Sequence, residues 1–326
     1  MTGSASMHGG HWRRAFTSEE IRGLRRISNL QGAWMVASNW LLMAGAAALV
    51  AWWPNVLTVL LAVFLIGSRQ LGLAIVMHEA AHRTLFTSRR LNDWAGNWLA
   101  AHWIFLSVEL YRPYHLQHHA HTGSERDPDM GLKRGFPTTT ASMARKVARD
   151  LLGVVGIKRL VGTAGFLLSA AFGRRAREGQ PITFMGTEVT RDAAARALLG
   201  FATTQSALLG GLWALGRPEL FALWAAAWLT TQNLVTRIRS IAEHAMTPAT
   251  EDPFRNTRTV RAGWLARLFV APNRVNHHLE HHLLMTVPHH RLPRLHAMLR
   301  DRGLLEDACV ADSYAHVLRA ATGRAG

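Results

Sequence analysis

The sequence predicts an all-α integral membrane protein, with four transmembrane helices in two hairpins and a cytoplasmic helical cap that is rich in histidine. Three observations indicate this fold class. Apolar residues form long blocks, arginines gather between the blocks, and many of the 18 histidines form spaced clusters near block ends. We expect a single domain over residues 1–326.

The first predicted hairpin covers residues 33–77. An apolar block at 33–53 is followed by Pro54-Asn55 and by a second block at 56–77, which only Ser68-Arg69-Gln70 interrupts. A spanning helix needs about 20 mostly apolar residues, so each block is long enough to cross a bilayer. Because the break is only two residues long, the two helices are expected to run antiparallel.

The second predicted hairpin covers residues 193–236. Its blocks are 193–215 and 219–235, separated by Gly216-Arg217-Pro218.

Between the hairpins, residues 94–110 and 151–172 are moderately apolar but carry charged side chains. Because charges deep in lipid are costly, we expect amphipathic helices along the inner membrane face there. Helices buried in a soluble core are the alternative interpretation.

The placement of arginine predicts the orientation. The N-terminal segment 1–32, the central region 78–192 and the C-terminal region 237–326 carry nearly all the arginines, whereas the hairpin tips carry one between them. The positive-inside rule therefore places these three regions, and both termini, in the cytoplasm.

The charge balance favours a membrane surface as a partner, and it does not favour nucleic acid. Lys+Arg is 37 against 21 for Asp+Glu, a formal charge of +16, and the cations flank apolar blocks. No groove-reading motif is recognisable. Cys309 is the single cysteine, so a bound metal would be held by histidine or carboxylate.

Four histidine clusters stand out; three have spacings that suit metal binding, and the other is the single His244, just beyond the fourth predicted span. His78 and His82 lie at positions i and i+4 of a helix and share a face. The spacing H-x-x-H-H occurs twice, and positions i, i+3 and i+4 present three imidazoles to one side of a helix. The predicted metal ligands are His78, His82, His115, His118, His119, His244, His278, His281 and His282.

Nine imidazoles are too many for one ion, since zinc takes four ligands at most of its sites. Two ions would share them with four or five each, which predicts a dimetal site in the cytoplasmic cap. Imidazole binds iron, copper, nickel and zinc, so the ligand type alone does not choose the metal. His121 and His277 stand beside the two triads, and their role stays open.

Carboxylates accompany the clusters. Glu79, Asp127, Asp129 and Glu243 lie close to predicted ligands in the sequence, and Glu280 lies within the last cluster. Metal-bound histidines commonly donate their second ring N–H to a carboxylate, which orients the ring. We therefore expect Glu79, Glu243 and at least one of the two aspartates to support the ligands.

Three of the clusters form boxes that resemble those of the membrane fatty acid desaturase superfamily. This superfamily includes acyl-lipid desaturases, carotenoid ketolases and hydroxylases, and alkane hydroxylases. Its boxes, H-x(3,4)-H, H-x-x-H-H and [HQ]-x-x-H-H, stand here at 78–82, 115–119 and 278–282. Residues 276–283, Asn-His-His-Leu-Glu-His-His-Leu, look especially like bacterial fatty acid desaturases, although His277 stands where such relatives often carry tyrosine.

The resemblance implies an enzyme with two non-haem iron ions (Fe2+/Fe3+) that uses O2 to introduce a double bond into a fatty acyl chain of a lipid. Members take electrons from a separate ferredoxin-, rubredoxin- or cytochrome-type carrier. The lone Cys309 excludes a fused ferredoxin or rubredoxin. The implied location is a bacterial inner membrane, with the site on the cytoplasmic side.

Other functions stay open at this point. The same dimetal core could hydroxylate or ketolate a lipid, a carotenoid or an alkane. His78-Glu79-x-x-His82 also fits the H-E-x-x-H motif of a membrane zinc protease, in which Glu79 would be the general base. That interpretation leaves seven clustered histidines without a role. A metal transporter or sensor is disfavoured because nine ligands would bind too tightly for release.

Overall fold

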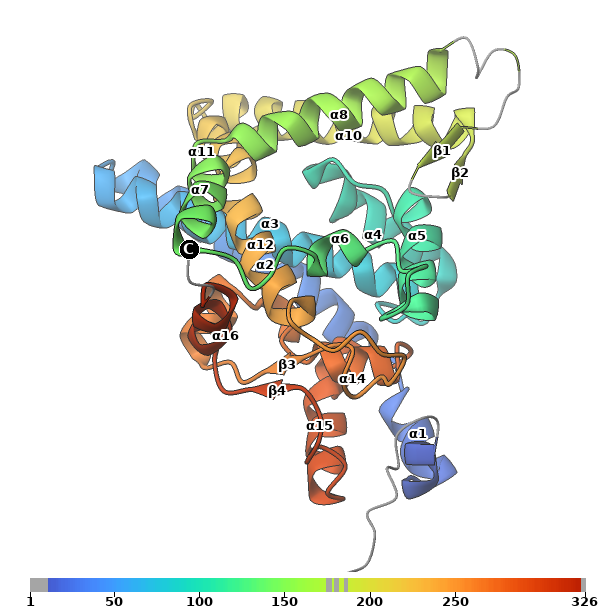
Figure 1. The fold of residues 1–326 in the computed structure, drawn as a ribbon. Coiled ribbons are helices and arrows are strands. Elements are labelled where there is room, and N and C mark those ends of the chain that lie inside the picture. The colour runs from blue at the N-terminus through green and yellow to red at the C-terminus, as the bar shows by residue number, and fades with distance from the viewer. Residues whose placement is uncertain (1–10, 174–177, 179–181, 185–186, 324–326) are drawn as a thin grey trace, which may run out of the picture.

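Residues 11–173, 178, 182–184 and 187–323 are described here from a computed structural model, so the first ten residues of the predicted N-terminal segment lie outside the described part. The chain is mostly helical (Figure 1). The α-helices are α1 (Ser18–Leu24), α2 (Asn29–Trp52), α3 (Val56–His82), α4 (Arg89–Trp98), α5 (Val108–His121), α6 (Met130–Lys133), α7 (Thr140–Leu151), α8 (Val154–Phe172), α10 (Arg191–Ala214), α11 (Leu220–Leu229), α12 (Thr231–His244), α13 (Trp264–Phe269), α14 (His278–Leu283), α15 (Leu292–Asp301) and α16 (Tyr314–Ala321).

Short 3-10 helices and two small sheets connect these helices. The strands β1 (Ile182–Phe184) and β2 (Thr187–Val189) pair antiparallel, and β3 (Thr259–Val260) and β4 (Val310–Ala311) pair parallel. The 3-10 helices are η1 (His11–Ala15), η2 (Ala101–Ile104), η3 (Pro272–Arg274) and η4 (His289–Arg291).

Helices α2 and α3 pack against each other and are joined by a short turn. Asn55 caps α3: its side chain accepts a hydrogen bond from the Thr58 N–H, and the Thr58 hydroxyl accepts one from the Asn55 N–H. Such a reciprocal cap satisfies backbone donors that the first helical turn leaves free. Apolar side chains stay exposed around this turn, including Trp52, Trp53 and Leu57, so this end of the pair is suited to lipid.

Among the described residues, three helical stretches are long and apolar enough to cross a membrane: Ser18–Trp52, α3 and α8. The segment 151–172, which includes α8, was predicted to lie along the membrane face. Two further spans were predicted at 193–215 and 219–235. The four-span count is therefore not confirmed. Helix α8 is apolar enough to be a candidate span because its charged residues lie close to its first turn. They interrupt only one end of the apolar run.

The predicted span at 219–235 is wrong as one continuous helix. The structure divides it into α11, with 10 residues, and α12. Thr230 lies between them with φ −117° and ψ −85°. The Asn233 side-chain amide donates to the carbonyls of Trp228 and Leu229, at 2.9 and 3.0 Å. These bonds satisfy acceptors that the helix break releases, and a buried break needs such partners.

Helix α3 lies centrally and contacts α2, α5, α11 and α12. Helices α8 and α10 run side by side at one end of the molecule, and α14, α15 and the β3–β4 pair lie toward the other (Figure 1). Helix α8 also approaches α11 closely, since a Cβ atom at Gly156 would lie 2.3 Å from the carbonyl oxygen of Leu229. The C-terminal ends of α3, α5 and α12 meet α14, because histidines from all four helices lie together.

Candidate metal centre

Four helices bring the predicted ligands together. His78 and His82 lie in the last turns of α3, and His244 is the last residue of α12. The two H-x-x-H-H boxes lie on α5 and α14. All nine histidines fall into two groups whose candidate ligand atoms lie within 4.8 Å of one another. The first group is His78, His82, His115, His119 and His281, and the second group is His118, His244, His278 and His282.

The division between the groups follows helical spacing. In each H-x-x-H-H box, the i and i+4 histidines join one group and the i+3 histidine joins the other. On α5, His115 and His119 belong to the first group and His118 to the second; on α14 the assignment is reversed. We expected each box to present three imidazoles to one side. The structure instead uses the angular offset of position i+3 to reach the neighbouring group, and it builds sets of five and four.

The imidazole nitrogens converge at a spacing typical of metal ligands. The Nε2 atom of His115 lies 2.9 Å from that of His82 and 3.0 Å from that of His119, which lies 3.0 Å from Nε2 of His281. With metal–nitrogen bonds of about 2.1 Å, ligands at right angles would be about 3.0 Å apart and tetrahedral ones about 3.4 Å. The first group therefore fits an ion with more than four ligands.

Several buried ring nitrogens lack a hydrogen-bond partner among the described residues. Both ring nitrogens of His78 are in this state, and so is Nε2 of His282. Buried polar atoms normally have a partner, so an unpaired set in a histidine cluster suits a bound ion. The two groups lie side by side, because the rings of His119 and His282 stack with centroids 4.2 Å apart. The site therefore fits a pair of neighbouring ions.

Burial keeps several of the ligands uncharged. It lowers the pKa of His115, His281 and His282 well below the usual value, and the neighbouring imidazoles lower it further. A neutral imidazole has the lone pair that a metal needs. These three imidazoles are thus in the protonation state for ligation at neutral pH.

The second group has close carboxylate support. Asp127 accepts a hydrogen bond of 2.7 Å from Nδ1 of His118, while Oδ2 of Asp129 lies 3.6 Å from the same nitrogen. The hydroxyl of Tyr114 donates to Asp129. The Asp127 contact leaves Nε2 of His118 free to face the group, which is the arrangement expected for an oriented metal ligand.

The other two predicted carboxylates lie farther from ligand nitrogens. Glu243 forms an ion pair of 2.7 Å with Arg239, and its Oε1 lies 3.6 Å from Nδ1 of His278. Burial raises the pKa of Glu243 to about 7, although Arg239 opposes this. Glu79 lies 3.9 Å from Nδ1 of His78. Neither distance is a hydrogen bond, so their supporting role stays a prediction.

Glu79 is held by groups other than the ligands. It accepts hydrogen bonds from the Thr84 hydroxyl at 2.9 Å and from the backbone N–H of His289 at 3.0 Å. A general base needs a free carboxylate near a metal-bound water. This carboxylate is engaged, and His78 and His82 belong to a group of five, which argues against the zinc protease.

A smaller cluster lies behind α14. Glu280 accepts from Nδ1 of His296 at 2.6 Å and from the Thr259 hydroxyl at 2.5 Å, and it lies 3.7 Å from Nδ1 of His277. Burial alone raises the pKa of Glu280, but His277 and His296 outweigh it and lower that pKa to about 2. His121 belongs to none of these groups and lines a surface hollow. Through these contacts Glu280 holds α14, the helix that carries three of the nine predicted ligands.

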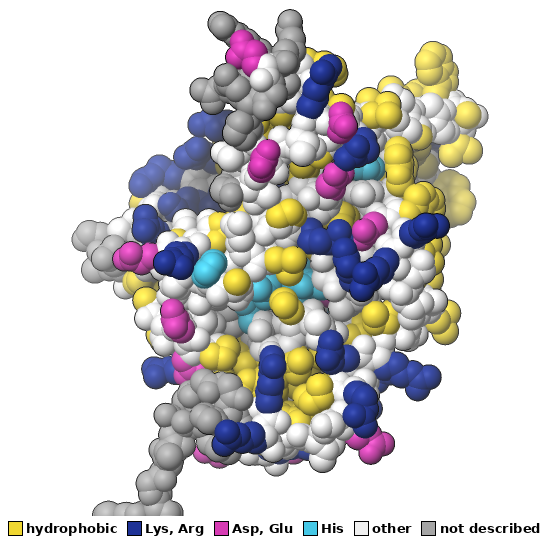
Figure 2. Space-filling view, turned by 90° about the vertical axis from the view of Figure 1, so that its right-hand side faces the viewer, with side chains coloured by type: hydrophobic (Ala, Val, Ile, Leu, Met, Phe, Trp, Pro, Cys, Tyr) yellow, Lys and Arg dark blue, Asp and Glu magenta, His cyan; other side chains and the backbone are white. Residues whose placement is uncertain are grey.

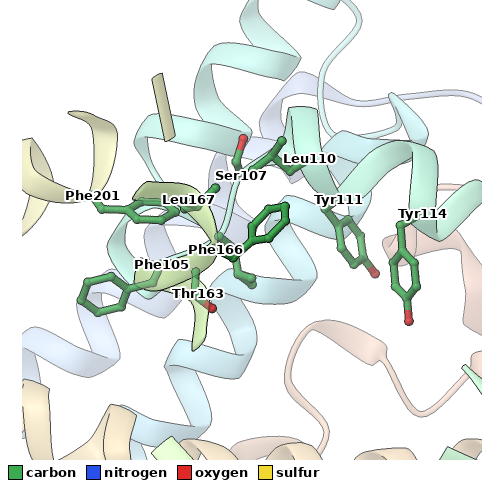
Figure 3. A pocket seen from close by; sticks show the side chains of 10 residues that line it. Phe105, Ser107, Leu110, Tyr111, Tyr114, Thr163, Phe166, Leu167 and Phe201 are labelled. Atoms are coloured by element: carbon green, nitrogen blue, oxygen red, sulfur yellow. The ribbon is translucent and has the colours of Figure 1, made fainter. Parts of the chain in front are cut away.

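An apolar cavity of about 230 Å³ lies beside the first group (Figure 3). Tyr111 forms the wall between them, because its ring stacks on that of His115 with centroids 4.8 Å apart and an angle of 16°. Burial raises the pKa of Tyr111, so its hydroxyl stays protonated. The lining side chains come from the η2–α5 region, α8 and α10: Phe105, Leu106, Ser107, Leu110, Tyr111, Tyr114, Thr163, Phe166, Leu167 and Phe201.

This cavity was not predicted from the sequence, although a signal was present. Tyr111 precedes His115 by four residues and therefore shares its helix face.

Histidine side chains also reach the surface at the middle of one face, with Lys and Arg side chains beside them (Figure 2). A polar hollow of about 280 Å³ opens beside His119 and His282. The centre is thus flanked by an apolar cavity and by a polar opening.

The helical fold and the two histidine groups define a class of mostly helical protein with candidate membrane spans and a histidine-rich site that could hold two metal ions. Residues 50–312 match the family described as “Fatty acid desaturase”. This chain therefore belongs to the fatty acid desaturase family, and it is an oxidoreductase.

Named relatives agree with the family. Dihydrorhizobitoxine desaturase of Bradyrhizobium elkanii is 29% identical over 277 residues, which cover 81% of this chain and 73% of that protein. Zeaxanthin 4-ketolase of Chlamydomonas reinhardtii is 32% identical over 35% of this chain and 24% of its own length. Beta-carotene 4-ketolase of Protosiphon botryoides is 35% identical over 28% of this chain and 23% of its own length. The ketolase likeness is therefore local.

Proposed function

We propose that this protein is a membrane-bound diiron fatty acid desaturase, which introduces a double bond into a fatty acyl chain of a lipid by using O2. The observation that carries this proposal is the contact between the apolar cavity and the nine-histidine centre through Tyr111 and His115. An unactivated carbon chain needs an apolar, water-excluding site next to the metal centre.

Iron is proposed as the metal at both groups. Two iron ions held by the five and four histidines would supply activation of O2 and removal of hydrogen from a C–H bond. The spacing of about 3 Å between Nε2 atoms favours more ligands per ion than tetrahedral zinc takes. The chain's own part is to hold the ligands neutral, orient His118 through Asp127 and confine the substrate against Tyr111.

The proposed topology keeps four spans in two hairpins, at 33–77 and 193–236, within a single domain. The segments 1–32, 78–192 and 237–326 would face the cytoplasm of a bacterial cell, together with both termini and the metal centre. Exposed tryptophans support this at both hairpin turns, since Trp52 and Trp213 are each more than 70% exposed and suit a membrane interface.

The two electrons would come from an external ferredoxin-, rubredoxin- or cytochrome-type carrier. The polar hollow beside His119 and His282 supports a route to the centre that does not pass through the apolar cavity. Lys and Arg side chains lie beside the exposed histidines on this face (Figure 2), and such cations would attract an acidic carrier.

A second candidate is hydroxylation or ketolation of a lipid, carotenoid or alkane on the same centre. The local likeness to two carotenoid ketolases favours keeping it. The two outcomes differ in the product: desaturation removes two hydrogens, while hydroxylation adds an oxygen.

The test is mass spectrometry of lipid and pigment extracts from cells that express the protein, beside a His118→Ala control. We expect acyl chains lighter by two hydrogens only with the intact protein. Chains or pigments with an added oxygen would instead establish the second candidate. No difference from the control, together with one zinc ion per chain, would overturn the diiron proposal.

A further inference from the structure

A second pocket, of about 390 Å³, lies among α6, α7, α8 and α12. Its lining includes four cations, Arg134, Lys146, Arg159 and Arg237, and no Asp or Glu among the described residues. Asp150 neutralises Arg237, through hydrogen bonds of 2.5 and 2.9 Å. The charge of Asp150 also acts on Arg159, whereas Arg134 and Lys146 have no carboxylate partner among the described residues. One carboxylate thus faces four cations, so the pocket carries an excess of positive charge.

Arg159 is half-buried and is held in place by neutral groups. Its guanidinium donates to the side-chain oxygens of Gln232 at 2.9 Å and Asn233 at 2.6 Å, and it lies over the ring of Trp228. Asp150 acts on Arg159 from a distance and is itself bonded to Arg237, so the guanidinium has no direct ion pair among the described residues. A partly buried cation is stabilised when a ligand supplies further negative charge. The arrangement therefore suits an oxyanion.

Helix α8 joins this pocket to the apolar cavity. Val155 and Arg159 line the basic pocket, while Thr163, Phe166 and Leu167 line the cavity. These positions follow the spacing of one helix face. Seven residues separate Arg159 from Phe166, which is about 10 Å along a helix.

A short segment also connects both pockets to the metal centre. Asp127 orients His118, and Asp129 accepts from Tyr114 in the cavity wall. Gly131 and Arg134, a few residues on, line the basic pocket.

We propose that Arg134, Lys146 and Arg159 bind the anionic end of the substrate, a carboxylate or phosphate group, while its apolar chain lies along α8 in the cavity. This inference rests on the proposed function and specifies the substrate as an amphiphile with an oxyanion. Charge-assisted hydrogen bonds from guanidinium and ammonium groups would fix the chain's register against Tyr111.

The test measures binding to the detergent-purified protein by native mass spectrometry, with oleic acid, dioleoyl phosphatidic acid and the neutral dioleoylglycerol as probes. We expect the anionic probes to bind more tightly than the neutral one. The double variant Arg134→Gln with Lys146→Gln should weaken their binding by about tenfold. Lys158→Gln is the matched control, because Lys158 is exposed on α8 and does not line the pocket.

Each outcome decides the inference. Preference for oleic acid alone identifies a carboxylate, and preference for phosphatidic acid alone identifies a phosphate headgroup; both support the pocket. Equal binding of the neutral probe, or equal effects of the double variant and Lys158→Gln, overturns it. Inorganic phosphate that binds through Lys146 while neither acyl acid does would show a free-anion site and also overturn it. Because binding needs neither O2 nor electrons, failure of the desaturation test is a separate result.

Discussion

The two histidine groups differ in how they are supported. The first has five members from α3, α5 and α14, and four of them form two i, i+4 pairs. The second has four members, of which only His278 and His282 form such a pair; the others are His244 at the end of α12 and His118, which Asp127 orients. The difference indicates that helical spacing sets more of the first group, whereas the second depends more on tertiary neighbours and has fewer ligands to spare.

Removing one ligand from each group should expose this difference most strongly. His118→Ala leaves three members in the second group, whereas His82→Ala leaves four in the first. We expect both variants to lose activity by at least about a hundredfold, but His118→Ala to lose more bound metal. Metal content per chain by mass spectrometry is the measurement, with the exposed His316→Ala as control. Equal metal loss in the two variants would contradict the comparison.

The carboxylates allow a finer comparison. Asp127→Asn removes the acceptor that orients His118 at 2.7 Å, and it should lower metal affinity by about 10- to 100-fold. Glu79→Gln should lower it less, because Glu79 lies 3.9 Å from His78 and a glutamine still accepts from Thr84. Chelator titrations of the two variants measure the affinities. A larger effect for Glu79→Gln would show that the first group also needs carboxylate support.

Filling the cavity tests whether the substrate chain lies beside the first group. Thr163→Phe adds an aromatic ring to the lining and should shift the products toward shorter acyl chains, with a severalfold loss of kcat/KM for long ones. Val161→Phe is the control, since Val161 is 67% exposed and does not line the cavity. Chain-length profiles of the products measure the effect, and identical profiles for both variants would rule out this cavity as the chain's site.

The smallest effect concerns the scaffold of the second group. Gly156→Ala would place a Cβ atom 2.3 Å from the carbonyl oxygen of Leu229, just before the break that leads into α12. We expect a loss of about 1–3 kcal/mol of stability, seen as a lower Tm in detergent. Gly162→Ala on the same helix meets no atom within 4 Å and should leave the Tm unchanged. An unchanged Tm in Gly156→Ala would mean that α8 and α11 can separate at little cost.

The family assignment and the members of the metal centre were within reach of the sequence. The spacing of His78 with His82 and the two H-x-x-H-H boxes gave eight candidates, the single His244 was the ninth, and the structure brings all nine together. Arg159 and Thr163 were not recognised as neighbours on one helix face, because no local pattern marks which side of an apolar helix faces a cavity. The break at Thr230 was missed since neither Gly nor Pro occurs there.

The sequence by itself determined which residues can be ligands and on which helices they lie, because i, i+3 and i+4 spacing is a local property of the backbone. Only the tertiary structure decided how the ligands divide, since sets of five and four arise where α3, α5, α12 and α14 meet. It also decided that Tyr111 separates the cavity from His115 and that four cations gather between α6, α7, α8 and α12. Such contacts depend on how helices distant in sequence pack, which local spacing does not encode.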